Sequence, residues 1–201
     1  MDPLDPGVLG VMRRLEIRDA QDRIDGTARA ERLRAVRPEV GRFLMTLALA
    51  TDATTIVECG TSGGYSTLWL AAAARQTGGR VTTFEVDPAK IARARETFVD
   101  AGVADLIDLR HADALQGLAG FSATADLVFL DVEKERYEEL LEPSVAALRP
   151  GGALVADNLV SHEDALAGFR DAALRHPDLT GLVVPFGRGE LVAVKTAEPS
   201  P

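Results

Sequence analysis

Acidic side chains stand at or near the ends of successive apolar runs in this 201-residue chain. The five members of this set are Glu58, Glu85, Asp113, Asp131 and Asp157. An open parallel sheet binds ligands at the carboxyl ends of its strands, beside the point where strand order reverses, so these carboxylates are expected to converge on one crevice. Clustered carboxylates repel unless donors or a cation satisfy them. The alternative is that each acid caps the next helix or turn, which explains one acid better than five in register.

A glycine-rich segment, residues 60–66, follows the first of these runs. Glycine lets the backbone turn tightly and lets a ligand approach, and the free N–H groups of a following helix suit an anionic group. The spacing is not the Gly-x-Gly-x-x-Gly dinucleotide fingerprint, which disfavours a nicotinamide-dependent oxidoreductase. Glu85 lies 21 residues after Gly64 and is placed to accept hydrogen bonds from two ribose hydroxyls. The segment and Glu85 together predict an adenosine-bearing ligand.

Short apolar runs alternate with helical patterns from residue 54 onward, which predicts an α/β fold, a doubly wound and mostly parallel Rossmann-like sheet. A break or kink is expected at Pro143, inside the helical stretch 136–148. Gly187-Arg188-Gly189 joins two late runs as a hairpin would, so the last strand is expected to run antiparallel. The predicted strands cover residues 55–60, 81–86, 107–110, 125–130, 152–156, 182–186 and 190–194.

The first fifty residues have a helical pattern. One apolar stripe runs from Val8 to Leu15, and Pro38 suits the first turn of another helix. Between them, Asp25-Gly26 interrupts the pattern and Thr27 is a candidate cap for a further short helix. We therefore expect one domain over residues 1–201, with a helical N-terminal cap at 1–52 and an α/β core at 53–201.

Composition excludes several classes. Apolar residues make up 46% of the chain and charged residues 26%, as in an ordinary globule. The longest apolar run, Leu68 to Ala74, is far shorter than the ~20 residues of a membrane span, and no signal peptide is evident. The single cysteine, Cys59, predicts a cytoplasmic location. The net charge of −9 disfavours nucleic acid, and the arginines between Arg13 and Arg42 are interpreted first as a solvated helix face and second as an RNA contact.

The motifs together resemble a known family. Glu58-x-Gly60-x-x-x-Gly64-Tyr65-Ser66, Glu85, Asp113 and the segment Leu148-Arg149-Pro150-Gly151-Gly152 resemble class I S-adenosylmethionine-dependent methyltransferases. The segment Asp131-Val132-Glu133-Lys134, with Ala156-Asp157-Asn158, is similar to the divalent-metal-dependent O-methyltransferases of the catechol and caffeoyl-CoA type. Glu133 stands where the family pattern often has a second Asp. The segment between Asn158 and Leu182 is shorter than in larger members, which leaves the acceptor open.

The resemblance implies a role for each matching residue. The metal ligands would be Asp131, Asp157 and Asn158, with Asp131 and Lys134 as the catalytic pair and Lys134 as the base near the acceptor hydroxyl. In the donor site, Gly60, Gly64, Ser66 and Asp131 would line the methionine end, Glu58 would lie near the methionine ammonium, Glu85 would hold the ribose and Asp113 the adenine amino group. Two carboxylates and one amide oxygen form an all-oxygen ligand set, which selects a hard cation such as Mg²⁺.

The resemblance thus implies an S-adenosylmethionine-dependent, Mg²⁺-assisted O-methyltransferase that acts on a small hydroxylated, catechol-like molecule. A homodimer, with the N-terminal helices over the acceptor pocket, is a further expectation. The alternatives are a non-catalytic S-adenosylmethionine-binding module and a tRNA-hydroxyl methyltransferase. The presence of Asp131, Lys134, Asp157 and Asn158 favours the enzyme, because a mere binder needs no metal ligands.

Overall fold

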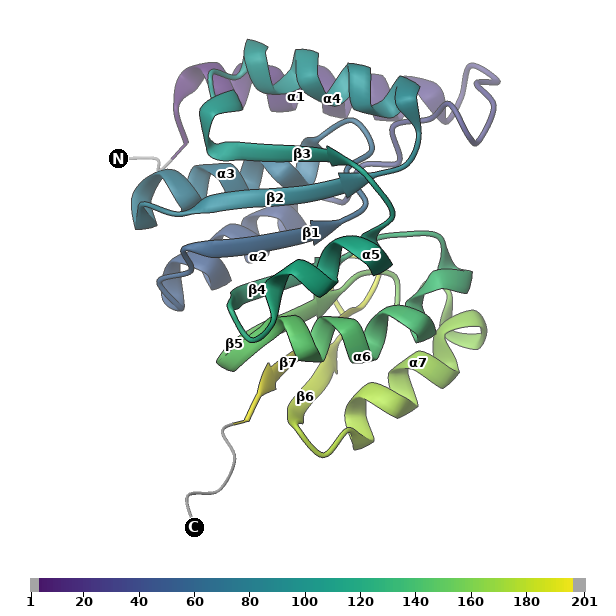
Figure 1. Ribbon diagram of the computed structural model, residues 1–201. Helices are drawn as coiled ribbons and strands as arrows, with labels where there is room; N and C mark the ends of the chain where they lie inside the picture. The colour runs from purple at the N-terminus through teal and green to yellow at the C-terminus, as the bar shows by residue number, and fades with distance from the viewer. Residues whose placement is uncertain (1–3, 197–201) are drawn as a thin grey trace.

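A single mixed sheet organises the part of the chain that the structure, a computed structural model, describes, residues 4–196. Its strand order is β3-β2-β1-β4-β5-β7-β6 (Figure 1). The strands are β1 Thr55–Cys59, β2 Arg80–Glu85, β3 Ile107–His111, β4 Ala125–Leu130, β5 Leu148–Ala156, β6 Leu179–Val184 and β7 Glu190–Lys195. The first five strands are parallel, whereas β7 pairs antiparallel with β5 and with β6. The predicted α/β class and the antiparallel last strand are confirmed.

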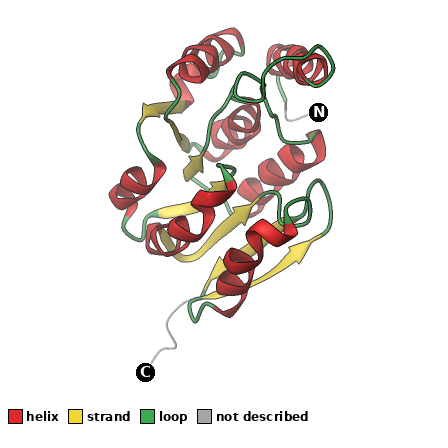
Figure 2. Cartoon of the chain, turned by 90° about the vertical axis from the view of Figure 1, so that its right-hand side faces the viewer, coloured by secondary structure: helices red, strands yellow, loops and turns green. Residues whose placement is uncertain are grey.

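Helices cover both faces of the sheet (Figures 1 and 2). One side carries α1 Pro6–Asp22, α2 Pro38–Ala50, α3 Tyr65–Thr77 and α4 Pro88–Asp100. The other side carries α5 Ala114–Leu118, α6 Tyr137–Ala147 and α7 Glu163–Arg175. Three short 3₁₀ turns, Ala104–Leu106, Ala119–Phe121 and Lys134–Arg136, complete the connections among the described residues. The expected ends of the domain, residues 1–3 and 197–201, lie outside these residues.

Alternate residues of each central strand enter opposite cores. Ile56 and Leu127 are buried under the α2–α3 side, while Val57 and Val128 are buried under the α6–α7 side. A strand that is buried on both faces has a nearly continuous apolar sequence, which explains why these strands could be predicted from the sequence.

The strand order reverses between β1 and β4, and the chain is tightly packed there. Gly60, directly after β1, has a φ of +97°, and a Cβ at this position would lie 2.2 Å from the carbonyl oxygen of Asp131, directly after β4. Glycine is therefore required on two grounds, its backbone conformation and the lack of space. The reversal leaves a crevice at the carboxyl ends of the strands, the edge that faces the viewer in Figure 2.

The segment between α1 and α2 is not helical, so the expected short helix at Thr27 is wrong. Asp22 accepts a hydrogen bond from the backbone N–H of Leu33 at 3.0 Å, and Asp19 accepts one from Ala35 at 3.1 Å. These long-range bonds satisfy the backbone groups that a helix would have paired locally. The Leu33 side chain also packs on Gly63, which fixes residues 23–37 over the glycine-rich segment.

Helix α6 continues through Pro143, so the expected break is wrong. Proline removes one hydrogen bond to the residue four positions earlier, here Glu139, which is exposed and can bond water instead. Among the described residues, no helix combines the length and the apolar character that crossing a bilayer requires.

Candidate active site

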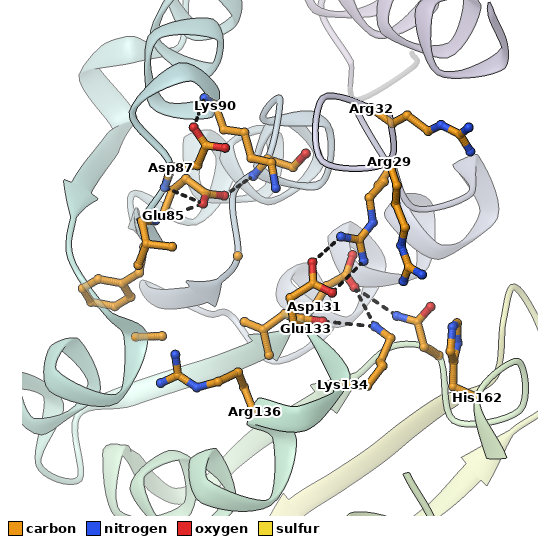
Figure 3. A pocket seen from close by; sticks show the side chains of 18 of the residues that line it. Arg29, Arg32, Glu85, Asp87, Lys90, Asp131, Glu133, Lys134, Arg136 and His162 are labelled. Carbon is orange, nitrogen blue, oxygen red and sulfur yellow. Dashed lines mark hydrogen bonds and ion pairs between the residues drawn. The ribbon is translucent and has the colours of Figure 1, made fainter. Parts of the chain in front are cut away.

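A cavity of about 750 Å³ occupies the crevice at the carboxyl ends of the strands (Figure 3). Of the five acids predicted to converge there, Glu85, Asp113 and Asp131 line the cavity. The other two, Glu58 and Asp157, are buried in the protein beneath it and are 0% and 1% exposed. The acidic pattern therefore divides into cavity-lining groups and groups that support the cavity from below.

One half of the cavity, which we call the donor half, lies over β1, β2 and β3. Glu85 at the end of β2 accepts backbone hydrogen bonds from Ser62 at 2.9 Å, Val86 at 2.9 Å and Asp87 at 3.1 Å. Figure 3 shows Glu85, Asp87 and Lys90 together on this side. These bonds fix the carboxylate and tie the glycine-rich segment to the end of β2.

The glycine-rich segment itself forms the inner wall of the donor half. Gly64 has a φ of +87° and is the N-cap of α3, so the first N–H groups of that helix face the crevice end. Gly60 lines the cavity, and Ser66 lines a small side recess beside it. Ser66 donates to the buried Glu58 at 2.6 Å.

Glu58 lies behind this wall and receives hydrogen bonds from three hydroxyl groups. Ser66, Thr67 and Thr83 donate at 2.6, 2.5 and 2.7 Å. Burial raises the pKa of the Glu58 carboxyl to about 7, and the hydroxyl donors oppose that rise. The structure thus places Glu58 as a support of the glycine-rich segment, and its contact with a methionine ammonium stays a prediction.

Asp113 lines the far end of the donor half and caps α5 by accepting from Leu115 N–H at 2.8 Å. Arg136 donates to both Asp113 oxygens, each at 3.0 Å. This two-pronged pair is the first cause of the lowered Asp113 pKa. The capping interpretation of this acid is therefore met, together with its expected position on the cavity wall.

The other half, which we call the acceptor half, contains the predicted metal ligands. Asn158 donates its side-chain N–H to Asp131 at 3.0 Å, so these two groups meet on the cavity wall. Asp157 accepts from the backbone N–H of Asn158 at 2.5 Å, and its other oxygen, Oδ2, has no hydrogen-bond partner. Burial, followed by the neighbouring Asp157, raises the pKa of Asp131 to about 6. The predicted set of three is brought together.

A third acidic residue, Glu190, belongs to this group and was missed from the sequence. It is the first residue of β7 and 0% exposed, and no N–H or hydroxyl group of the described residues donates to its carboxylate oxygens, so the hydrogen-bonding neighbour of Glu190 is the Asp157 carboxyl. Burial and the adjacent Asp157 raise the pKa of Glu190 to about 10. The sequence feature that could have indicated it is an acidic residue at the start of an apolar strand, Glu190-Leu191-Val192-Ala193-Val194.

Lys134 enters the acceptor half from below Asp131, as Figure 3 shows. Its Nζ lies 3.7 Å from Asp131 Oδ1 and donates to the carbonyl of Val132 at 3.1 Å. The side chain is 8% exposed, and burial lowers its pKa, while Asp131 and Asp157 oppose that shift. A lysine with a lowered pKa beside an acidic group has the properties of a proton acceptor.

Arginines line the mouth of the acceptor half. We call this set the arginine rim, and it consists of Arg23, Arg29, Arg32, Arg34, Arg37 and Arg188. The first five do not lie on a helix face as predicted, because they belong to the non-helical segment over the cavity, whereas Arg13, Arg14 and Arg18 are exposed on α1 as predicted. His162, interpreted from the sequence as a loop histidine, also lines the cavity.

Comparisons with known proteins agree on one family. The family model described as O-methyltransferase matches residues 24–175. A relative from Mycobacterium sp. (strain JLS) is 35% identical over 177 residues, which cover 80% of this chain and 79% of its own. A protein named catechol O-methyltransferase from Mycobacterium tuberculosis is 37% identical over 139 residues, 69% of this chain and 63% of its own. The crystal structure of an O-methyltransferase from Streptomyces achromogenes in complex with SAM has a TM-score of 0.77 and 27% identity, covering 93% of this chain and 90% of its own.

Proposed function

The chain belongs to the O-methyltransferase family of class I S-adenosylmethionine-dependent enzymes, and from this premise we propose that it methylates a hydroxyl group of a small molecule with the help of a divalent cation. We propose vicinal hydroxyls on the acceptor, because one relative is named catechol O-methyltransferase and a cation can bind two adjacent oxygens. The observation that carries the proposal is the contact between Gly60 and Asp131, which joins the donor and acceptor halves at one wall.

The donor half fits an adenosyl sulfonium. Glu85 keeps about one acceptor site for a ribose hydroxyl, because a carboxylate has about four such sites and the backbone uses three here. Gly60, Gly64 and Ser66 would border the methionine end, with Glu58 behind them, and Asp113 would lie at the adenine end. The relative in complex with SAM is consistent with this assignment.

The acceptor half fits a hard divalent cation on the chemistry of its donors. Asp157 Oδ2 is buried without a partner, which is costly for an ionised carboxylate unless a cation satisfies it. Asp131 supplies a second carboxylate, and turning the Asn158 amide would present its oxygen in place of the N–H. Within residues 4–196, no group of three or more His, Cys, Asp or Glu side chains is placed to hold a metal ion. The amide of Asn158 and non-protein oxygens would therefore have to complete the coordination.

A divalent cation held by these residues would lower the pKa of the acceptor hydroxyl. Lys134 would take the hydroxyl proton on Nζ, because its burial favours the neutral amine. Asp131 would hold that Nζ in place through the 3.7 Å contact. The walls of the cavity align the acceptor oxygen with the donor methyl, and such alignment is a large source of rate.

The test is methyl transfer from isotope-labelled S-adenosylmethionine to catechol and its derivatives, with Mg²⁺ and with EDTA. We expect methylated product only with the cation. Full activity in EDTA would contradict the role of the metal, and binding of S-adenosylmethionine without turnover on any hydroxyl would favour a non-catalytic module.

We also propose a cytoplasmic homodimer. The N-terminal helix α1 and the segment after it expose Ile17 and Ile24, which are 71% and 79% accessible and would favour burial in an interface. The one cysteine, Cys59, is free and buried, which suits a reducing compartment. Light scattering tests the dimer, and a mass near that of one chain, 21.4 kDa, would contradict it.

A further inference from the structure

The cavity has a charge opposite to that of the whole protein. Nine cationic side chains line it, the six of the arginine rim with Lys90, Lys134 and Arg136, against the six acids Asp19, Glu85, Asp87, Asp113, Asp131 and Glu133. The chain as a whole has a net charge of −9. Such a local reversal attracts anionic ligands to the site although the rest of the surface repels them.

Most of the rim arginines are already engaged within the protein. Arg34 forms an ion pair with Glu133, and Arg23 forms one with Asp19 at 2.8 Å. Arg32 donates to a backbone carbonyl at 2.8 Å, and Arg37 lies 3.7 Å from Glu39. These contacts hold the rim in place and partly neutralise it.

Two rim arginines differ from the rest. Among the described residues, the side chains of Arg29, which is exposed, and Arg188, which is half-buried, have neither an ion pair nor a hydrogen bond, yet both line the cavity. The charge of Arg188 opposes the raised pKa values of Asp131 and Glu190. The backbone carbonyl of Arg188 accepts from the N–H groups of Val160 at 3.0 Å and Ser161 at 2.9 Å. Arg188 is therefore anchored next to the segment that begins with Asn158, close to the proposed reaction centre.

The side chains that line the cavity are mostly charged, and few of them could stack on an aromatic ring of a ligand. Within the described lining, Phe84 is the one Phe, Tyr or Trp side chain, and it belongs to β2 on the donor half. Figure 3 shows Arg29 and Arg32 on the opposite side of the view from Glu85, Asp87 and Lys90, with Asp131 near the centre and Lys134 below it. An acceptor that lies over Asp131 would thus meet guanidinium groups and the imidazole of His162, and no Phe, Tyr or Trp ring of the described lining.

We propose that the methyl acceptor carries an anionic group, a carboxylate or a phosphate, and that Arg29 and Arg188 bind this group while the hydroxyl lies at Asp131 and Lys134. The proposal rests on the proposed function and narrows its substrate class. A guanidinium can donate two parallel hydrogen bonds to a carboxylate or phosphate, so a pair of unengaged arginines selects for such a group. A neutral catechol would leave both guanidinium groups unused.

The experiment compares kcat/KM for four probes that share the dihydroxyphenyl ring: catechol, dopamine, 3,4-dihydroxybenzoate and 3,4-dihydroxybenzylphosphonate. We expect the better of the two anionic probes to exceed catechol by about tenfold or more, with dopamine below catechol. The ratio between the carboxylate and the phosphonate identifies which anion the site prefers. Equal values for the neutral and anionic probes, or a preference for dopamine, would overturn the inference while leaving methyl transfer established.

Variants locate the effect. In Arg29→Gln and Arg188→Gln, the ratio of anionic to neutral kcat/KM is expected to fall by about tenfold for each lost charged pair, and Arg188→Lys should restore part of it. Arg13→Gln, an exposed arginine of α1 outside the cavity, is the matched control and should keep the wild-type ratio. An unchanged ratio in both cavity variants would overturn the inference.

A binding measurement separates this inference from the proposed function. Calorimetric titration of 3,4-dihydroxybenzoate into the protein with S-adenosylhomocysteine and Mg²⁺ requires no turnover. Binding that weakens in both cavity variants supports the anion site even if every acceptor fails to react, in which case only the proposed function falls. Methyl incorporation into bulk tRNA far above all four probes would overturn the small-molecule acceptor.

Discussion

The two halves of the cavity satisfy their charged groups in different ways. In the donor half, Glu85 is bonded by three backbone N–H groups and Asp113 by Arg136. In the acceptor half, the side chains of Arg29 and Arg188 form no ion pair or hydrogen bond with the described residues, and no N–H or hydroxyl group among these residues donates to Asp157 Oδ2 or to the carboxylate of Glu190 beneath it. The donor half is thus organised by the fold itself, whereas the acceptor half depends on groups that the chain does not supply.

This contrast has an energetic meaning. Leaving a buried polar group without a hydrogen-bond partner costs about 1–3 kcal/mol of folding free energy, and more when the group is charged. The acceptor half therefore lowers the stability of the folded protein, while its polar groups stay available to bind a ligand. Changes in the acceptor half should therefore reduce activity and can increase stability, whereas changes in the donor half should weaken cofactor binding and leave stability lower or unchanged.

The strongest test of the contrast is Asp131→Ala, which removes a carboxylate from the wall shared by the two halves. We expect kcat/KM for methyl transfer to fall by about 10³-fold or more, because the change removes a proposed metal ligand worth several kcal/mol in the transition state. Steady-state assays with saturating Mg²⁺ measure this. Asp164→Ala, an exposed acid of α7, is the control and should retain wild-type rates.

Lys134 is expected to give the next largest effect. Lys134→Ala should lower kcat by about 10²–10³-fold, as for loss of a general base. Lys134→Arg keeps the positive charge but is a poor proton acceptor, so it should remain equally slow. In the wild type, activity should rise with pH and level off below the ordinary lysine pKa of 10.5, because burial lowers the pKa of Lys134. A fully active Lys134→Arg variant would show that charge alone suffices.

The donor half is tested through Glu85→Gln. We expect affinity for S-adenosylhomocysteine to fall by about tenfold, the value of one hydrogen bond to a charged group, with kcat at saturating donor nearly unchanged. Calorimetry and steady-state assays separate the two parameters. Asp105→Asn makes the same change of charge at an exposed position and should leave affinity unaltered. Unchanged affinity in Glu85→Gln would remove the ribose assignment.

The smallest expected effect is one of stability. Glu190→Gln should stabilise the metal-free protein by about 1–3 kcal/mol, since it removes a buried acid to which no N–H or hydroxyl group of the described residues donates. The pKa of Glu190 is raised to about 10 from an ordinary 4.5, so the folded state holds a proton that the unfolded state has lost. Stability must then fall as pH rises between these two values.

Thermal unfolding in EDTA at pH 7 to 9 measures this slope, which should be shallower in Glu190→Gln. Below pH 7, Glu58 and Asp131, with raised pKa values of about 7 and 6, add slopes of the same sign. Glu135→Gln, at an exposed position, is the matched control. An equal slope in wild type and Glu190→Gln would contradict the raised pKa.

The sheet and the acid pattern could be predicted because they depend on local signals. Runs such as residues 127–130 are apolar throughout, since both faces of the strand are buried, and the acid that follows marks the strand end. The predicted hairpin also matches, although β6 ends at Val184, two residues before the expected 186. The same local signals placed Asp131, Asp157 and Asn158 at neighbouring strand ends.

The arginine rim and Glu190 could not be predicted because they depend on long-range contacts. Arg29 lies over the cavity only because Asp19 and Asp22 hold the backbone of residues 33 and 35, and no periodicity encodes those bonds. Glu190 reaches Asp157 through the pairing of β7 with β5, a contact between residues far apart in sequence. His162 and Arg188 reach the cavity on two loops that are far apart in sequence. The backbone carbonyl of Arg188 accepts hydrogen bonds from Val160 and Ser161, which holds the two loops together.

The tight approach of Gly60 to Asp131 has a consequence for how such an enzyme can diversify in evolution. The spacing between the two halves of the cavity at Gly60 and Asp131 is set by two neighbouring strands, and a larger side chain at position 60 would disturb their packing. The residues proposed to choose the acceptor stand instead on surface loops, where exchange of a side chain costs little stability. Descendants of this sequence could therefore acquire new acceptors by changing positions such as 29 and 188, while inheriting the transfer geometry unaltered.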